Sequence, residues 1–293
     1  MNTPMEILHR YRIRPNKRLG QSFLVDVNTI HKIAAAAQVT SEDIVLEIGA
    51  GIGVMTQQIA QIAKRVIAVE IDPLLVEILR DQLAGFASVE IHSGDILKLD
   101  FNSISIDCNA KIKVIGNVPY NISSPVIFHL LSHRSVIGSF MLMLQKEVAE
   151  RLVSPPNCKS YGVPSVLLQM HAAVEKYFDV SPGCFYPVPK VSSAVIGGVF
   201  REMPLLALSD EEHFTRLVKA SFAQRRKMLM NNLKHAGFLE GLTDDDLQST
   251  LDKAGIDGKR RGETLSVAVF GHLSNMLKNR LAKPAEIRMP GRH

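Results

Sequence analysis

Apolar runs alternate with amphipathic segments through the first half of the chain. Residues 54–63 and 73–83 repeat apolar positions at helical spacing, and Asp72 followed by Pro73 is a typical helix N-terminus. Short runs rich in β-branched residues lie between such segments and predict strands over residues 44–48, 66–70, 89–92, 112–115 and 136–144. Because strands and helices alternate strictly, we predict an α/β fold whose parallel sheet is covered by helices on both faces.

The pattern changes beyond a predicted helix over residues 147–152. The next stretch predicts loops over residues 154–157 and 181–183 and strands over residues 173–180 and 191–200. From about Ser209 onward, helical patterns follow one another with no strand between them. We therefore expect an α/β domain over residues 1–203, a small all-helical domain over residues 204–281 and a flexible tail over residues 282–293.

The composition is that of a soluble globular protein, with 46% hydrophobic and 22% charged residues in a chain of 293. The longest apolar run, residues 136–144, is nine residues long and too short to span a bilayer. Neither the three cysteines (Cys108, Cys158 and Cys184) nor the ten histidines have metal-ligand spacing, so we expect reduced thiols and no metal. No apolar h-region follows the basic residues near the N-terminus, so we expect no secretory signal. We expect a cytoplasmic monomer that contacts no membrane.

Positive charge is concentrated toward the C-terminus. Residues 201–293 hold 16 Lys and Arg against 12 Asp and Glu, a net charge of +4, whereas the whole chain carries +5. Two basic clusters lie there, Arg225-Arg226-Lys227 and Lys259-Arg260-Arg261. This distribution favours a polyanionic partner such as nucleic acid, although charge runs are more often solvated faces. We expect the first cluster on a helix whose apolar positions Phe222, Leu229 and Leu233 face inward.

A glycine-rich turn follows the first predicted strand. Residues 47–53 read Glu-Ile-Gly-Ala-Gly-Ile-Gly and open a helix, so the backbone at Gly49 can approach a ligand closely at the carboxyl end of the strand. The spacing is G-x-G-x-G and not the dinucleotide-binding G-x-G-x-x-G, because position 54 is valine. Such a turn is also compatible with a purely structural role.

Acidic residues end the next two predicted strands. Glu70 offers two acceptor oxygens that match the vicinal hydroxyls of a ribose, and Asp95 can accept a hydrogen bond from the exocyclic amine of adenine. Either side chain alone is equally well explained as a helix cap. Together with the glycine turn, the two acids indicate a ligand that contains adenosine, a condition that NAD and S-adenosylmethionine both satisfy.

The fourth predicted strand ends in Asn117-Val118-Pro119-Tyr120, at the same edge of the sheet. The Asn117 side-chain oxygen and the Val118 carbonyl are suited to hold the hydrogens of an aryl amine, and Pro119 would fix that backbone geometry. Tyr120 would stack on the base, a contact that tolerates any base. This arrangement requires no catalytic His or Lys, because positioning and electrostatics supply most of the catalysis.

These motifs, in their order and spacing, resemble the rRNA adenine N6,N6-dimethyltransferase family. The resemblance runs from about residue 10 to 280: residues 17–24 resemble its N-terminal motif and residues 185–195 its post-catalytic loop. Residues 224–229 and 261–266 resemble helical-domain signatures of its bacterial small-subunit branch. The resemblance implies a Rossmann-like class I S-adenosylmethionine-dependent methyltransferase sheet, followed by a small helical domain that binds rRNA or the ribosome.

The same resemblance implies the reaction. Methyl groups would pass from S-adenosylmethionine to the exocyclic amines of two adjacent adenines in the 3′-terminal hairpin of 16S rRNA, within the immature 30S subunit. Tyr120 and Phe185 would sandwich the target adenine, although core packing alone explains Phe185 equally well. The implied donor contacts are Ser22, Leu24, Gly49, Glu70, Asp95 and Asn117, the catalytic residues are Asn117, Val118, Pro119, Tyr120 and Phe185, and the RNA contacts are Arg225, Arg226 and Lys227.

Three positions depart from the family's pattern. Ser22 stands where the family usually has Asn or His, which weakens the implied donor contact there. Gly262 stands where Pro is usual and should loosen that turn, and Met230 stands where Arg is common and removes one basic RNA contact. None of the three departures touches Asn117 and its neighbours.

Other functions stay open. The large-subunit branch of the same family, whose members confer antibiotic resistance, is disfavoured by the two helical-domain signatures, as is a DNA adenine methyltransferase with a similar Asn-Pro-Pro-Tyr tip. A non-catalytic assembly factor is disfavoured by the intact residues 117–120. A nicotinamide oxidoreductase is disfavoured by the glycine spacing and by the lack of a suitable hydride-transfer acid. We also hypothesise that methylation triggers release of the protein from the subunit.

Overall fold

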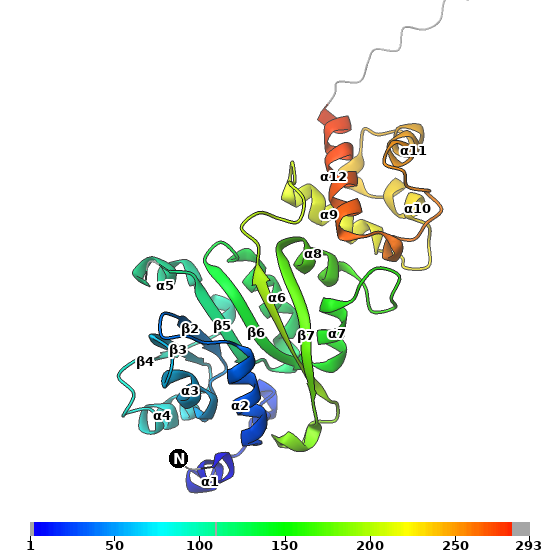
Figure 1. Cartoon of the computed structure of the whole chain (residues 1–293). Coiled ribbons are helices and arrows are strands. Elements are labelled where there is room, and N and C mark those ends of the chain that lie inside the picture. The colour runs from blue at the N-terminus through cyan, green and yellow to red at the C-terminus, as the bar shows by residue number, and fades with distance from the viewer. Residues whose placement is uncertain (1–2, 109, 283–293) are drawn as a thin grey trace, which may run out of the picture. The chain divides into compact units, whose positions relative to one another are not determined.

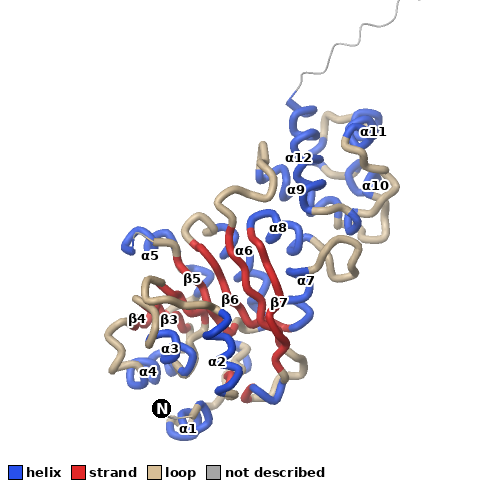
Figure 2. Tube along the Cα trace, in the orientation of Figure 1, coloured by secondary structure: helices blue, strands red, loops and turns tan. Residues whose placement is uncertain are grey.

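The computed structural model describes residues 3–108 and 110–282, apart from the side chains of residues 106–108. The tail expected over residues 282–293 thus lies outside the described residues beyond Ala282. The chain divides into two compact units: the first holds the chain up to Val153 together with Ala172–Glu202, and the second holds Ser154–His171 and the chain from Met203 onward. The first unit contains strands and helices, and the described part of the second is helical (Figure 1, Figure 2).

A seven-stranded sheet of order β4-β3-β2-β5-β6-β9-β7 forms the centre of the first unit. Its strands are β2 (Ile44–Ile48), β3 (Arg65–Glu70), β4 (Val89–Ser93), β5 (Ile112–Asn117), β6 (Ile137–Gln145), β7 (Ala172–Val180) and β9 (Ser193–Phe200). β2 to β6 run parallel, as predicted, whereas β9 pairs antiparallel with both β6 and β7. The alternation rule did not cover this antiparallel end, because the chain passes from β7 to β9 without an α-helix.

Helices cover both faces of this sheet, which confirms the predicted α/β architecture. In Figure 1, α2 lies in front of the strands and α6 lies behind them. α2 and α3 pack on one face, where Ile33 and Ile59 share a buried cluster with Val45 and Ile115. The helices of this unit are α1 (Pro4–Arg10), α2 (Val27–Ala36), α3 (Val54–Ala60), α4 (Pro73–Gln82), α5 (Phe101–Cys108), α6 (Ser123–Ser132) and α7 (Lys146–Val153).

The place of each strand in the sheet explains its residue pattern. β2 lies inside the sheet and all of its residues are buried, as expected for a strand covered on both faces. β7 forms one edge of the sheet, and most of its residues are exposed or half-buried. Glu47 is the one charged residue of β2, so it stands in the most enclosed part of the fold, next to the glycine-rich turn.

The second unit is a group of helices around a core that includes Phe214, Leu217, Leu273 and Leu277. Its helices are α8 (Val163–His171), α9 (Glu211–Ser221), α10 (Leu229–Lys234), α11 (Asp244–Lys253) and α12 (Val267–Ala282). α8 belongs to this unit although it precedes β7 in the sequence. The single boundary expected at residue 203 would place α8 in the first domain instead. No described helix is long and apolar enough to cross a membrane.

The prediction that Arg225-Arg226-Lys227 lies on a helix is wrong. These residues lie in a turn between α9 and α10, within which the Lys227 N–H donates to the Gln224 carbonyl. The cause is a tertiary contact: the Leu229 N–H donates to the Arg260 carbonyl at 2.6 Å, so the backbone of α10 starts against another segment instead of continuing α9. Leu229 and Leu233 are buried, as predicted.

Candidate active site

A single cavity collects the residues expected to bind donor and target. It opens at the carboxyl ends of the parallel strands, where the strand order reverses between β2 and β5, the usual ligand site of an open α/β sheet. Its volume of about 130 Å³ is roughly ten times the space that one water molecule needs. Ten of the expected residues line it: Ser22, Leu24, Gly49, Glu70, Asp95, Asn117, Val118, Pro119, Tyr120 and Phe185.

The glycine-rich turn brings backbone close to this cavity. Gly49 and Gly51 have φ angles of 69° and 59°, in the left-handed region that favours glycine. A Cβ atom on Gly49 would lie 3.5 Å from the Asn117 carbonyl oxygen, so the turn after β2 adjoins the end of β5. The Gly51 N–H donates to Glu70 Oε2 at 2.9 Å, which ties the turn to the end of β3. Three strand ends therefore meet around one space.

Glu70 is held rigidly at the end of β3. It is 6% exposed, and its carboxylate accepts hydrogen bonds from the N–H groups of Gly51, Ile71 and Asp72, each at 2.9 Å. Burial raises the pKa of this carboxyl, and the three backbone donors oppose that shift. Oε2 receives only one of the three bonds, so it keeps a lone pair for a ligand hydroxyl.

The position of Asp95 is compatible with both of the roles that the sequence left as alternatives. Its Oδ1 accepts a hydrogen bond from the Leu97 N–H at 3.0 Å and caps the 3-10 turn η2 (Ile96–Lys98). Its Oδ2 makes no hydrogen bond within the described part of the chain. Since Asp95 also lines the cavity, one oxygen fixes the side chain and the other is available to a ligand amine.

Asn117 has a defined orientation at the end of β5. Its Nδ2 donates to the Ser22 carbonyl oxygen at 3.0 Å, which leaves Oδ1 as the atom able to accept hydrogen bonds from a ligand. Ser22 takes part through its backbone, and its own Oγ donates to the Pro187 carbonyl oxygen at 3.0 Å. The Ser22 departure from the family's pattern thus leaves the contact with Asn117 intact.

Val118 to Tyr120 continue the wall of the cavity beyond Asn117. Val118 is buried, and its N–H donates to the Met143 carbonyl oxygen of β6 at 3.1 Å. Pro119 holds an extended backbone, with φ −53° and ψ 135°, and leads into the 3-10 turn η3 (Tyr120–Ile122). The Tyr120 hydroxyl shares a hydrogen bond of 2.7 Å with Ser193 Oγ. The ring of Tyr120 is therefore anchored at its far end.

Phe185 both packs in the core and lines the cavity. It lies in β8 (Phe185–Tyr186), which pairs antiparallel with β1 (Phe23–Leu24), so that Leu24 and Phe185 stand opposite each other. Both side chains belong to one buried cluster of the first unit, and Phe185 is only 2% exposed. The core-packing interpretation and the site interpretation of Phe185 are both compatible with this position.

Glu47 lines the cavity, although our sequence analysis gave it no role. It is 3% exposed, and its Oε2 has no hydrogen-bond partner within the described residues. Burial, with a smaller contribution from the nearby charge of Glu70, raises the pKa of Glu47 to about 8. The signal that could have identified Glu47 is a charged residue inside a fully buried strand, because burying such a group without a partner costs free energy.

The basic cluster of the second unit has two kinds of member. Arg225 Nη2 donates to Glu263 Oε2 and to the Lys159 carbonyl oxygen, both at 2.8 Å, so its guanidinium holds three segments together. Arg226 and Lys227 are exposed, and their side chains have no hydrogen bond or ion pair with the described residues. The Leu229 N–H donates to the Arg260 carbonyl, so the backbone that follows the first cluster lies against the second cluster.

Gly262 is required by this backbone. A Cβ atom at this position would lie 2.6 Å from the Ser221 carbonyl oxygen, far inside van der Waals contact. Gly262 is buried and begins the 3-10 turn η6 (Gly262–Thr264). The absence of a side chain at Gly262 therefore permits close packing against α9, and the expectation that the departure from proline loosens the turn stays a prediction.

The donor set of the described residues offers no metal site. No group of three or more His, Cys, Asp or Glu side chains is arranged to hold an ion among residues that the structure describes. The side chains facing the cavity are acids, amides and apolar groups, and its lining contains no His or Lys. The chemistry of the site is therefore hydrogen bonding and apolar packing around a ligand.

Comparison with known proteins shows to which family the chain belongs. Residues 12–274 match the family "Ribosomal RNA adenine dimethylase". The chain belongs to this family. It is therefore an enzyme that depends on S-adenosylmethionine and methylates adenine of ribosomal RNA, on a Rossmann-like class I methyltransferase fold, as the sequence predicted.

Relatives of this ribosomal RNA adenine dimethylase cover nearly all of the chain. It is 44% identical over 273 residues to the "Ribosomal RNA small subunit methyltransferase A" of Syntrophus aciditrophicus, over 93% of this chain and 97% of the relative. The protein of the same name from Geobacter metallireducens is also 44% identical, over 90% of this chain and 96% of the relative.

Two solved structures share the fold. A dimethyladenosine transferase from Plasmodium falciparum matches with a TM-score of 0.75 and 27% identity, covering 85% of this chain and 94% of that one. The 23S rRNA methyltransferase ErmE matches with a TM-score of 0.67 and 27% identity, covering 87% of this chain and 99% of that one.

Proposed function

We propose that this enzyme dimethylates two adjacent adenines in the 3′-terminal hairpin of 16S rRNA, acting on immature small subunits as a cytoplasmic monomer. The observation that carries the chemistry is the orientation of Asn117, whose Nδ2 is occupied by Ser22 while Oδ1 is left to accept. The choice of subunit rests on the name that relatives 44% identical to this chain carry.

The residues at the strand ends fit the methyl donor. We assign the ribose hydroxyls to Glu70 Oε2, which accepts only the Gly51 N–H, and the exocyclic amine of the donor's adenine to Asp95 Oδ2, which has no donor among the described residues. The open backbone of Gly49 and the apolar Leu24 complete this part of the cavity. When bound, S-adenosylmethionine supplies an electrophilic methyl group, and the protein's task is to hold the acceptor amine in line with it.

The target side uses acceptors and rings. Asn117 Oδ1 and the Val118 carbonyl accept the two hydrogens of the adenine amine, which draws the nitrogen out of the ring plane and directs its lone pair. Preorganised acceptors of this kind stabilise the charge that develops during transfer. Tyr120 and Phe185 hold the base between their rings. The adenine must leave its stack to enter, at a cost of about a few kcal/mol.

The second unit supplies contacts that do not read sequence. Arg226 and Lys227 are exposed cations suited to phosphate oxygens, which position RNA without specifying its bases. Arg225 supports them by bridging Glu263 and Lys159. We therefore revise its role from phosphate contact alone to support of the turn that presents its neighbours.

Methylation of the large subunit is the close alternative, because the structure of ErmE resembles this chain over 87% of its length. The experiment incubates the enzyme and labelled S-adenosylmethionine with small and large subunits purified from cells that lack adenine dimethylation. Our proposal expects label in the small subunit, none in the large one, and none in subunits that already carry the modification. Label in the large subunit alone would assign the enzyme to the other branch. Donor binding without label in either would favour an assembly factor.

A further inference from the structure

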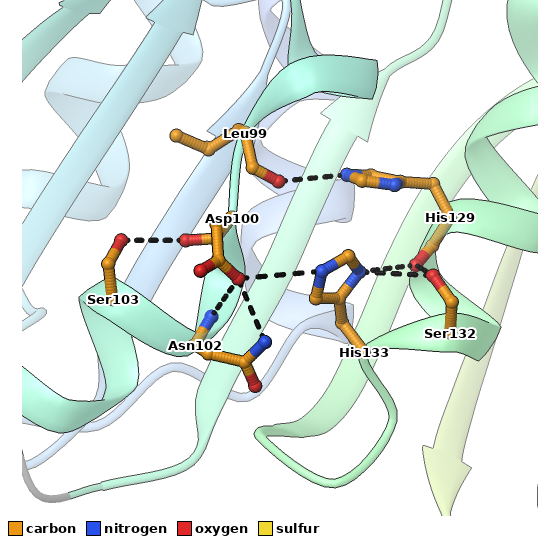
Figure 3. Close-up of polar contacts among 7 residues, drawn as sticks. All are labelled: Leu99, Asp100, Asn102, Ser103, His129, Ser132 and His133. Carbon is orange, nitrogen blue, oxygen red and sulfur yellow. Dashed lines mark hydrogen bonds and ion pairs between the residues drawn. The ribbon is translucent and has the colours of Figure 1, made fainter.

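A pair of histidines lies beneath the segment that carries Asp95. His129 lies on α6, His133 is the residue that caps its C-terminus, and their ring centroids are 4.6 Å apart. The ring of Phe101, which is fully buried, packs against both at 5.3 and 5.2 Å. Figure 3 shows the two imidazoles directed at Leu99 and Asp100, the residues just beyond η2. None of these side chains lines the cavity.

His129 makes the direct link. Its Nε2 lies 3.0 Å from the Leu99 carbonyl oxygen, and because a carbonyl only accepts, this nitrogen carries the hydrogen. Burial lowers the pKa of His129, opposed in part by this bond, so the neutral form with hydrogen on Nε2 prevails near neutral pH. His133 adds a second link, because its Nε2 lies 3.6 Å from Asp100 Oδ1 and its Nδ1 lies 2.9 Å from the His129 carbonyl oxygen.

These links bear on η2 because it is a single short turn. The Leu99 N–H donates to the Ile96 carbonyl and the Lys98 N–H donates to the Asp95 carbonyl, so η2 depends on both of its ends. Ile96 is its buried residue, while Lys98 and Asp100 are exposed. A shift of Leu99 would therefore move the Leu97 N–H that orients the Asp95 carboxylate.

The same helix also carries the catalytic end of the site. α6 begins at Ser123, directly after η3, and the Ser123 Oγ donates to the Pro119 carbonyl oxygen at 3.4 Å. Its first turn thus supports the residues around Tyr120, and its last turn supports the segment around Asp95. One rigid element fixes the spacing between the two.

We propose that His129 is a positioning residue for donor recognition, which fixes Asp95 toward the adenine amine of the donor through the Leu99 carbonyl. The inference rests on the role assigned to Asp95 in the proposed function. It predicts that replacing His129 lowers the preference for ligands that carry the adenine amine over ligands that lack it. A general loss of stability would not change this preference. A hydrogen bond between an amine and a carboxylate contributes about 1.5–3 kcal/mol, which corresponds to roughly 10- to 100-fold in affinity.

The test compares two donor analogues by calorimetry with the full-length enzyme. S-adenosylhomocysteine has the exocyclic amine, and S-inosylhomocysteine has a carbonyl oxygen in its place. The wild type should prefer the adenosine compound by roughly 10- to 100-fold. His129→Asn should reduce the preference to within about threefold, because an Asn amide overlies Nδ1 and cannot reach Leu99. His129→Gln should retain most of it, because a Gln amide overlies Nε2.

The controls separate the possible failures. Asp95→Asn should lose the preference by itself, and adding His129→Asn to it should cause no further loss, as expected when two residues act in series. If the wild type or His129→Asn binds both analogues too weakly to measure, amide hydrogen exchange of residues 95–102 provides the second readout, with faster exchange in His129→Asn and not in His129→Gln. An unchanged preference in His129→Asn would overturn the inference and leave the role of Asp95 standing. No preference in the wild type would overturn both.

Discussion

At the scale of single residues, function depends on which atoms of a side chain are left without a partner. Asn117 and Asp95 each use one polar atom to fix the side chain and leave another toward the cavity, whereas both oxygens of Glu70 accept backbone hydrogen bonds and Oε2 accepts only one. Divided use of this kind preorganises a site, since no rotation is needed when a ligand arrives. The sequence indicates which residue types are present at the strand ends, but the free atom is known only from the structure.

Replacement of Asn117 tests the catalytic role. Asn117→Ala removes the acceptor for the target amine, and the single-turnover rate of methyl transfer at saturating donor should fall by about 100-fold or more. Asn28→Ala is the matched control, because Asn28 is exposed on α2 and does not line the cavity. A rate for Asn117→Ala within a few-fold of the control would show that other groups hold the amine.

Glu47 gives a prediction about pH. Its folded pKa of about 8 exceeds the ordinary value of 4.5, so between these pH values the unfolded chain is ionised while the folded one keeps its proton. Glu47 should therefore contribute a loss of stability from pH 4.5 to about 8, of about 1 kcal/mol per pH unit or less. Glu47→Gln should remove this slope, and its stability relative to the wild type should increase with pH.

Urea unfolding at pH 5, 6, 7 and 8 provides the measurement. Glu42→Gln serves as the control, because Glu42 is exposed and its replacement should leave the slope unchanged. Parallel stability curves for the wild type and Glu47→Gln would mean that Glu47 is ionised in the folded protein.

At the scale of elements, some helices and strands follow from the local sequence pattern and others depend on tertiary contacts. The strands β2 to β6 are predictable because β-branched runs in a covered sheet have few alternatives, and the acids at their ends then meet at one edge. The short strands β1 and β8 are not predictable from local sequence, because each has only two residues and pairs with a strand far along the chain. Ser22 and Phe185 were therefore assigned through family resemblance, and the pairing explains how both come to line the same cavity as Asn117.

The turn after α9 shows the limit of periodicity. Residues 222–233 have helical spacing, yet Leu229 begins a new helix against the Arg260 carbonyl. A contact across many residues overrides a local pattern that has no packing of its own. The same holds for α8, whose sequence does not show that it packs with helices that follow the sheet.

The basic turn yields a prediction with two separable effects. Arg226→Ala and Lys227→Ala should each reduce the slope of log affinity for RNA against log salt by about 1, with an unchanged melting temperature. Arg225→Ala should lower the melting temperature, because Glu263 and the Lys159 carbonyl lose a charged partner. Lys32→Ala, an exposed lysine on α2, controls for loss of charge alone. Equal salt slopes for all four variants would exclude this turn from the RNA interface.

At the scale of the whole molecule, a catalytic unit and a basic helical unit belong to one chain, and we expect binding and chemistry to be coupled. If methylation triggers release, Asn117→Ala should bind unmethylated small subunits as the wild type does and dissociate more slowly in the presence of donor. Dissociation of labelled enzyme, chased with unlabelled enzyme, measures this. Identical dissociation rates for the variant and the wild type would rule out coupling between methylation and release.

The central claim is that this cavity dimethylates two neighbouring adenines of small-subunit rRNA. The most direct measurement is mass-spectrometric mapping of rRNA from unmethylated small subunits after incubation with the enzyme and S-adenosylmethionine. We predict two adjacent N6,N6-dimethyladenosines in the 3′-terminal hairpin. Neither should form when the Asn117→Ala variant replaces the wild type. Dimethyladenosine at any other site, or the same product from the Asn117 variant, would contradict it.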